Sequence, residues 1–264
     1  MNKRTFKVGI VGLGDSSKRF IPQAFQEGTG LELARVADIV PEKDKRPTLE
    51  SMVSTHPDYV RLDPSGRLPP RFFEGLDAVY IASPNDAHLH QTIESLLQGV
   101  LTVTEKPLVR NMGELLALKA VMEAGVPGIL FAQNHYYFKP ATRYAIKKLP
   151  ELVKQHGKVT MIDVHFAEKG NLTGLPREKW LITPEAGGGV CIDLMPHMAT
   201  VLNAVTGSKL LECHRAEAFD MYVERGFSSE TGVITSFFAR GKYLAPLSTN
   251  GTNVQMRLAK GVQK

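Results

Sequence analysis

Two glycines near the N-terminus could hold a phosphate-containing ligand. In the run VGIVGLGDSSKR, both follow an apolar β-rich stretch and precede a helix-like stretch. Gly12 permits a tight turn, and Gly14 lets the backbone approach a pyrophosphate placed on the positive end of the helix. Ser17 stands where a third glycine is usual, and its small side chain still allows the helix and strand to pack closely. The candidate phosphate-binding residues are Gly12, Gly14, Asp15, Ser16 and Ser17.

An acidic residue ends the second β-rich segment, LELARVAD. In a dinucleotide fold, Asp38 at this position would accept hydrogen bonds from the adenine ribose hydroxyls. The alternative is a turn or cap role, in which aspartate is common. A carboxylate repels a 2′-phosphate and Ile39, not arginine, follows it, so NAD is the expected cofactor. Arg35 and Lys43 lie nearby and keep NADP as the second candidate.

Two further segments carry a family resemblance. Residues 78–107, AVYIASPNDAHLHQTIESLLQGVLTVTEKP, contain Ser-Pro-Asn, then a histidine, a helix and Glu-Lys-Pro, and GGGVCIDLMPHMATVL has Asp and His after a glycine cluster. This order resembles the glucose-fructose oxidoreductase, inositol dehydrogenase and MocA (Gfo/Idh/MocA) family over residues 6–205. The resemblance implies an NAD(P)-dependent dehydrogenase or reductase acting on a CH–OH group of a sugar, polyol or sugar derivative.

The resemblance implies catalytic roles for three residues. Lys106 would lie between nicotinamide and substrate, with Asp193 and His197 facing it from the second domain. Oxidation of a secondary alcohol removes a hydride from carbon and a proton from oxygen. His197 is the candidate base, and the Lys106 ammonium would stabilise the alkoxide-like transition state and orient the substrate.

Local spacing agrees with these roles but also allows simpler ones. Asp193 and His197 are four residues apart and share one face of a helix expected over residues 194–204. A helix N-terminus and a nearby lysine would both favour a neutral His197. Alternatively, Asp193 is the N-cap of this helix with Pro196 in its first turn, and His197 is an interior histidine. Lys106 alone would be read as a solvated loop residue.

Further candidates follow from the same resemblance. The loop near the nicotinamide and its ribose would contain Ser83, Pro84, Asn85, His88 and Glu105. Asn85 could instead cap the next helix. His88 and His90, without a carboxylate partner, are a surface pair by default, and no metal site is expected. The substrate pocket would be lined by His135, Tyr137 and Lys139, with Lys169, Arg177 and Trp180 as weaker candidates.

The elements that must position these residues form two expected domains. From Phe6 to about Asn134, apolar strands alternate with helices, which predicts a doubly wound parallel α/β sheet of Rossmann type. Residues 135–264 contain long alternating segments and two helices, which predicts an α+β domain with a mainly antiparallel sheet. The last residues, from Leu247 to Lys264, read as a polar tail.

Composition narrows the functional classes. The 264 residues are 43% hydrophobic and 22% charged, as in a soluble globular protein, with neither a membrane-spanning run nor a signal-peptide pattern. We therefore expect a cytoplasmic protein that does not bind membranes. Two cysteines without CxxC spacing predict neither disulfides nor a zinc site. The net charge of +5 is scattered, which disfavours nucleic-acid binding and fits a small anionic ligand.

The C-terminal region is shorter than the family pattern leads one to expect. Either its sheet is smaller, or the final strands are missing or supplied by a partner chain. A short sheet with an exposed apolar face would promote a homo-oligomer, a dimer or tetramer formed through that sheet. The leading hypothesis is an oxidoreductase whose partner is a small-molecule sugar, polyol or sugar phosphate. The alternative is a non-catalytic NAD(P)-binding sensor or regulatory protein of the same fold.

Overall fold

The computed structural model describes residues 4–157, 159, 161–169, 190–206, 210–219, 236–243 and 252–261. The chain forms two compact units that meet at Gln133 and Asn134 in the sequence. Among the described residues, no helix combines the length and the apolar character needed to cross a bilayer. The same part of the chain holds no group of three or more His, Cys, Asp or Glu side chains placed to bind a metal ion.

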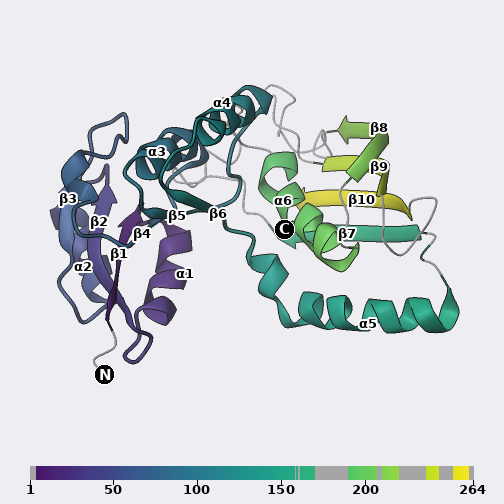
Figure 1. Ribbon diagram of the computed structural model, residues 1–264, viewed down its shortest axis with the longest axis horizontal. Coiled ribbons are helices and arrows are strands. Elements are labelled where there is room, and N and C mark those ends of the chain that lie inside the picture. Colours follow the sequence, from purple (N-terminus) through teal and green to yellow (C-terminus); the bar gives the residue numbers. More distant parts are fainter. Residues whose placement is uncertain are drawn as a thin grey trace. The chain divides into compact units, whose positions relative to one another are not determined.

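The N-terminal unit is a parallel six-stranded sheet with the strand order β3-β2-β1-β4-β5-β6, as Figure 1 shows. The parallel Rossmann sheet expected from the sequence is thereby confirmed. Its elements are β1 (Phe6–Val11), α1 (Asp15–Ala24), β2 (Leu31–Asp38), α2 (Glu42–Glu50), β3 (Asp58–Arg61), η1 (Pro70–Phe72), β4 (Ala78–Ile81), α3 (Asn85–Leu97), β5 (Leu101–Thr104), α4 (Met112–Glu123) and β6 (Ile129–Ala132). Helix α2, strand β3 and the 3₁₀ turn η1 were not expected from the sequence.

Alternating strand residues build a core on each face of this sheet. Val11 belongs to one buried cluster, together with Phe72 of η1. Its neighbour Ile10 belongs to the other, where Ile21 of α1 and Leu49 of α2 cover it. Successive strand side chains point to opposite faces, so both faces must be covered. The sequence order of the strands reverses between β1 and β4, and the carboxyl ends of strands at such a point are where ligands bind in open α/β sheets.

The second unit contains a four-stranded sheet with the order β7-β10-β9-β8. Its elements are η2 (His135–Phe138), α5 (Pro140–His156), β7 (Met161–Lys169), α6 (Val190–Thr206), β8 (Leu210–Phe219), β9 (Ser236–Tyr243) and β10 (Thr252–Gly261). Strand β9 pairs antiparallel with both neighbours, whereas β10 pairs parallel with β7. The expectation of a polar tail is corrected here, because ten of its residues form β10.

Candidate functional site

The glycine turn at the end of β1 packs against the loop that follows β4. Gly12 has a φ of +87°, and a Cβ there would lie 2.8 Å from the Ala82 carbonyl oxygen and from the Ser83 nitrogen. The backbone N–H of Gly12 donates to the Ala37 carbonyl at 2.8 Å. Ser17 is fully buried and its hydroxyl donates to the Gly12 carbonyl. Glycine is therefore required at position 12 by backbone conformation and by close packing together.

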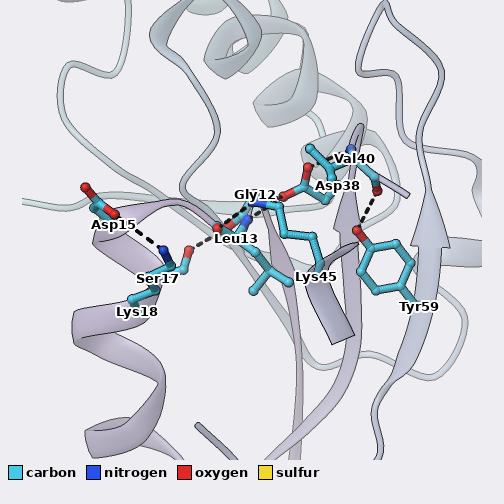
Figure 2. A network of polar contacts seen from close by, with 9 residues as sticks. All are labelled: Gly12, Leu13, Asp15, Ser17, Lys18, Asp38, Val40, Lys45 and Tyr59. Atoms are coloured by element: carbon cyan, nitrogen blue, oxygen red, sulfur yellow. Dashed lines mark hydrogen bonds and ion pairs between the residues drawn. The ribbon is translucent and has the colours of Figure 1, made fainter. Parts of the chain in front are cut away.

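The other glycine of the turn faces open space. Gly14 is the N-cap of α1, and a Cβ on it would meet nothing within 4 Å. Ser16 in the first turn of α1 is exposed, and so is Asp15, whose carboxylate lies 3.7 Å from the Lys18 ammonium (Figure 2). A pyrophosphate fits this arrangement, since the first N–H groups of the helix meet a backbone without a side chain.

The two glycines provide a matched pair of substitutions. Gly12→Ala should lower the free energy of unfolding by about 3 kcal/mol through left-handed strain and backbone collision. Gly14→Ala should cost less than about 1 kcal/mol, as an N-cap change in open space. It should nevertheless weaken NADH binding, because its methyl group occupies the approach to the turn. Urea unfolding and NADH titration measure the two effects, and wild-type NADH affinity in Gly14→Ala would refute the pyrophosphate assignment.

Asp38 is a buried carboxylate that holds the glycine turn. Its Oδ2 accepts the Leu13 N–H at 2.8 Å and its Oδ1 accepts the Val40 N–H at 2.9 Å (Figure 2). Tyr59 then donates to the Val40 carbonyl at 2.7 Å. The capping alternative is thus realised in part. A carboxylate has about four lone-pair sites, so Asp38 can both fix the turn and accept ribose hydroxyls.

The basic residues near Asp38 differ from those that the sequence suggested. Arg35 donates to the carbonyls of Arg71 and Phe72, each at 2.9 Å, and so supports η1. Lys43 is exposed on α2. Lys45, which was not a candidate, reaches the turn: its ammonium donates to the Leu13 carbonyl at 3.0 Å and lies 3.6 Å from Asp38 Oδ2.

The loop after β4 is fixed by its own side chains. Ser83 donates to Gln91 at 2.6 Å, and Gln91 donates to the Gly66 carbonyl at 2.7 Å. Pro84 is the N-cap of α3, and Asn85 is the buried first residue of that helix. The alternative in which Asn85 caps the helix is therefore wrong, because Pro84 occupies that position.

His88 and His90 are not a surface pair. His88 is 1% exposed, and its Nδ1 and Nε2 lie 2.7 Å from the Pro107 carbonyl and 2.8 Å from the Ser83 carbonyl. The Nε2 of His90 is also buried. Burial lowers the pKa of His88, although the two carbonyls favour the protonated ring. The ring therefore connects the Ser83 loop to the segment after Lys106, which is a supporting position.

The burial of His88 predicts a dependence of stability on pH. The unfolded chain binds a proton at this ring below about pH 6.5, where the folded chain, with its lowered pKa, resists it. The free energy of unfolding should then fall on acidification, by at most about 1.4 kcal/mol per pH unit from this group. Urea unfolding between about pH 7.5 and 5 should give a flatter profile for His88→Gln than for wild type.

His90→Gln on the same helix is the matched control for that profile. It also removes one histidine from α3, but its ring is not held between the two carbonyls. A wild-type slope in His88→Gln, or an equal flattening in His90→Gln, would contradict the assignment.

Lys106 follows β5 in a segment that is held from two sides. The backbone N–H of Lys106 donates to Glu105 Oε2 at 3.1 Å. Tyr80 donates its hydroxyl hydrogen to Glu105 Oε1, and its ring stacks on Phe20 with centroids 4.5 Å apart. Burial, and then the Glu105 charge, raise the pKa of Tyr80, so its hydroxyl remains a donor. With His88 on the Pro107 carbonyl, these contacts fix the backbone that carries Lys106.

In the second unit, Asp193 and His197 lie on α6 and are 6% and 5% exposed. Helix α6 begins at Val190, so Asp193 is inside its first turn and the N-cap alternative is wrong. Pro196 also lies inside the helix, beyond its first turn. Helix-terminal charge effects fade after the first turn, so the helix N-terminus gives no reason to expect a neutral His197.

Aromatic residues of η2 surround His197. The ring centroids of His135 and Tyr136 lie 4.8 Å and 4.4 Å from that of His197. The Lys139 ammonium lies 5.7 Å from the Tyr136 ring centroid. Tyr137 instead contacts Phe138 and Arg143. The sequence had not suggested Tyr136, although it lies between two residues that it did suggest. Arg177, Trp180 and the Lys169 side chain lie outside the described residues.

Comparison with known proteins gives a family match, and two curated oxidoreductases are among the similar proteins. Residues 6–125 match the Gfo/Idh/MocA model, described as an oxidoreductase family with an NAD-binding Rossmann fold. A 1,5-anhydro-D-fructose reductase of Ensifer adhaerens is 28% identical over 61% of this chain and 50% of its own length. The uncharacterized oxidoreductase YdgJ of Escherichia coli is 25% identical over 73% of this chain and 51% of its own length. The chain thus spans about half the length of these relatives.

Solved structures share the fold at lower sequence identity. Myo-inositol 2-dehydrogenase from Lactobacillus plantarum has a TM-score of 0.76 at 17% identity, covering 97% of this chain and 70% of its own. Scyllo-inositol dehydrogenase from Lactobacillus casei, solved with NAD(H) and scyllo-inositol, has a TM-score of 0.73 at 20% identity, covering 97% and 71%.

Proposed function

Because residues 6–125 belong to the Gfo/Idh/MocA oxidoreductase family with its NAD-binding Rossmann fold, we propose that the chain is an NAD(P)-dependent dehydrogenase or reductase. The reaction is hydride transfer between the nicotinamide and a secondary alcohol of a sugar, polyol or sugar derivative. The observation that carries the proposal is that Gly12 follows β1, Asp38 ends β2 and Lys106 follows β5, all at the carboxyl edge of one parallel sheet.

The cofactor would be held by the turn between β1 and α1. The open backbone at Gly14 and the first turn of α1 would take the pyrophosphate. The remaining lone pairs of Asp38 would accept the adenine ribose hydroxyls. The nicotinamide half would lie along the loop after β4, with Ser83, Pro84 and Asn85, and beside Lys106. When bound, the nicotinamide accepts or returns the hydride.

Three side chains would handle the substrate hydroxyl. The Lys106 ammonium donates a hydrogen bond to the substrate oxygen and stabilises negative charge as it develops there. His197 takes the hydroxyl proton, so the alcohol loses one hydride and one proton in balance. Asp193, one helical turn earlier on α6, stabilises the imidazolium that His197 becomes. Tyr137 and Lys139 would hydrogen-bond further hydroxyls or a phosphate.

The substrate class is proposed by analogy with the relatives. Among them are a protein described as an anhydro-sugar reductase and others described as inositol dehydrogenases. Cyclic, hydroxyl-rich compounds suit a lysine donor, an aspartate and a histidine base. A cytoplasmic dimer or tetramer formed through the C-terminal sheet belongs to the same proposal.

The test begins with binding and then asks for turnover. Calorimetric titration should give NADH binding, and a panel of inositols, anhydro-sugars and sugar phosphates with NAD(P)⁺ should yield at least one substrate-dependent increase in NAD(P)H absorbance. Binding without turnover on the full panel and on the reverse ketone panel would favour the non-catalytic sensor. Absence of dinucleotide binding would overturn both hypotheses.

A further inference from the structure

We infer that Lys45 makes the adenosine end of this dinucleotide site accept a 2′-phosphate, so the chain binds both NADP(H) and NAD(H). The inference rests on the proposed function, because it assumes that the turn between β1 and α1 holds a dinucleotide. It goes beyond that function by assigning the choice of cofactor to one side chain that the sequence did not suggest.

The first step is the charge at the end of β2. Asp38 is the residue that would exclude a 2′-phosphate, because a carboxylate repels a phosphate at short range. In this structure its Oδ2 lies 3.6 Å from the Lys45 ammonium, and the two side chains are 8% and 22% exposed. At that separation the pair carries no net charge, and a phosphate arriving beside it does not meet an isolated carboxylate.

The second step is the hydrogen-bonding capacity of Lys45. Its ammonium has three N–H donors, of which one is directed to the Leu13 carbonyl at 3.0 Å. If a second N–H is directed to Asp38, the third N–H can still donate to an oxygen of the 2′-phosphate. The side chain keeps a fifth of its exposure, so a ligand can reach it. Lysine is a common phosphate ligand because its ammonium acts as a point charge on a flexible stem.

The third step is the position of Lys45 relative to the turn. Figure 2 shows its side chain extending from α2 to the Gly12–Leu13 segment, beside Asp38. The backbone of Leu13 is thus fixed at both groups: its N–H donates to Asp38, and its carbonyl accepts from Lys45. Two other basic residues near this carboxylate have partners of their own: Arg35 donates to η1, and Arg46 contacts Glu42 and the Pro57 carbonyl. Lys45 forms an ion pair with the carboxylate that would select the cofactor.

The variants separate charge from support of the turn. Lys45→Gln keeps an N–H donor for the Leu13 carbonyl but removes the charge, and Lys45→Arg keeps both. Lys43→Gln removes the same charge from the exposed side of the same helix and controls for long-range electrostatics. Circular dichroism and thermal unfolding establish that each variant is folded before titration with NADH and NADPH.

We expect the wild-type chain to bind NADPH within about tenfold of NADH. Lys45→Gln should weaken NADPH binding about tenfold, the size of one charge-assisted hydrogen bond, and NADH binding less than about threefold. Lys45→Arg should retain NADPH binding, and Lys43→Gln should leave the ratio of the two affinities unchanged. In the wild-type chain, raising the salt concentration should weaken NADPH binding more steeply than NADH binding.

Several results would overturn the inference. An equal loss of both affinities in Lys45→Gln would reduce Lys45 to a support of the turn. If the wild-type chain bound NADPH more than about a hundredfold more weakly than NADH, Asp38 would still exclude the 2′-phosphate despite the Lys45 charge. If Lys45→Gln does not fold, equal salt slopes for the two dinucleotides decide against the inference. Failure to bind either dinucleotide would instead overturn the proposed function itself.

Discussion

Replacing Lys106 with methionine is expected to lower kcat/KM by about a thousandfold while changing NADH affinity less than about threefold. The methionine side chain preserves most of the volume and removes the ammonium. That group is proposed to meet charge that develops on the substrate oxygen in the transition state. An interaction that exists mainly in the transition state lowers kcat when it is lost, and KM changes little.

The geometry around Lys106 supports a large effect from this one charge. The Glu105 carboxylate accepts hydrogen bonds from the Lys106 backbone N–H and from the Tyr80 hydroxyl, and the His88 ring contacts the Pro107 carbonyl. A backbone held on both sides of the lysine limits the positions that its side chain samples. Such preorganisation is what makes a single donor worth several orders of magnitude in rate.

A charge-matched control keeps the Lys106 experiment specific. Lys119→Met removes a lysine from α4 whose ion pair with Glu123 is exposed, at 62% and 67% of the two side chains. Turnover should not change in that variant. Wild-type kcat/KM in Lys106→Met, or an equal loss in Lys119→Met, would remove Lys106 from the mechanism. Parallel NADH titrations show whether any loss arises from the cofactor site instead.

The N-terminal sheet could be predicted because its signals are local. The apolar strands, the glycines of the turn and the acid at the end of β2 can each be recognised within a short stretch of sequence. Strand–helix alternation then leaves a doubly wound parallel sheet as the expected arrangement. The close packing around Gly12 could not be predicted from the local sequence. A Cβ at this position would collide with the backbone of Ala82 and Ser83, which lie about seventy residues later in the chain.

The contacts around the site were harder to foresee because they are tertiary. Lys45 lies in EKDKRPTLE, a charged segment with an internal proline, where no apolar period marks the helix α2. Tyr80 and Glu105 come from the ends of two neighbouring strands, and only the sheet register brings them together. In the sequence, His88 looks like an ordinary polar residue of a helix. Only the folded structure places its ring between the Pro107 and Ser83 carbonyls.

One element was missed although its signal is present. In β10, Val254, Met256 and Leu258 alternate with polar residues, which is the period expected of a strand. Its parallel pairing with β7 joins segments about ninety residues apart, and nothing local encodes that partner.

The start of α6 also differs from the sequence prediction. The helix begins at Val190, so Asp193 lies in the first turn and is not the N-cap. A shift of this size is typical of helix boundaries predicted from sequence.

His197→Gln is the second substitution with a large expected effect, a loss of about a thousandfold in kcat. Glutamine retains hydrogen-bonding capacity but cannot take a proton near neutral pH, so the substrate hydroxyl would have to lose its proton to water or hydroxide. The rate in the variant should therefore rise with pH over a range in which the wild-type rate has levelled off. A residue that only packs against His135 and Tyr136 would give no such change in the pH profile.

The control for His197 is another histidine of the same unit. His156→Gln changes an exposed residue at the end of α5 and should leave kcat and its pH profile unchanged. Asp193→Asn should show an intermediate loss of kcat, since it removes the charge that stabilises the imidazolium without removing the base. A His197→Gln variant with wild-type kcat, or with a reduced kcat and an unaltered pH profile, would show that the base lies elsewhere.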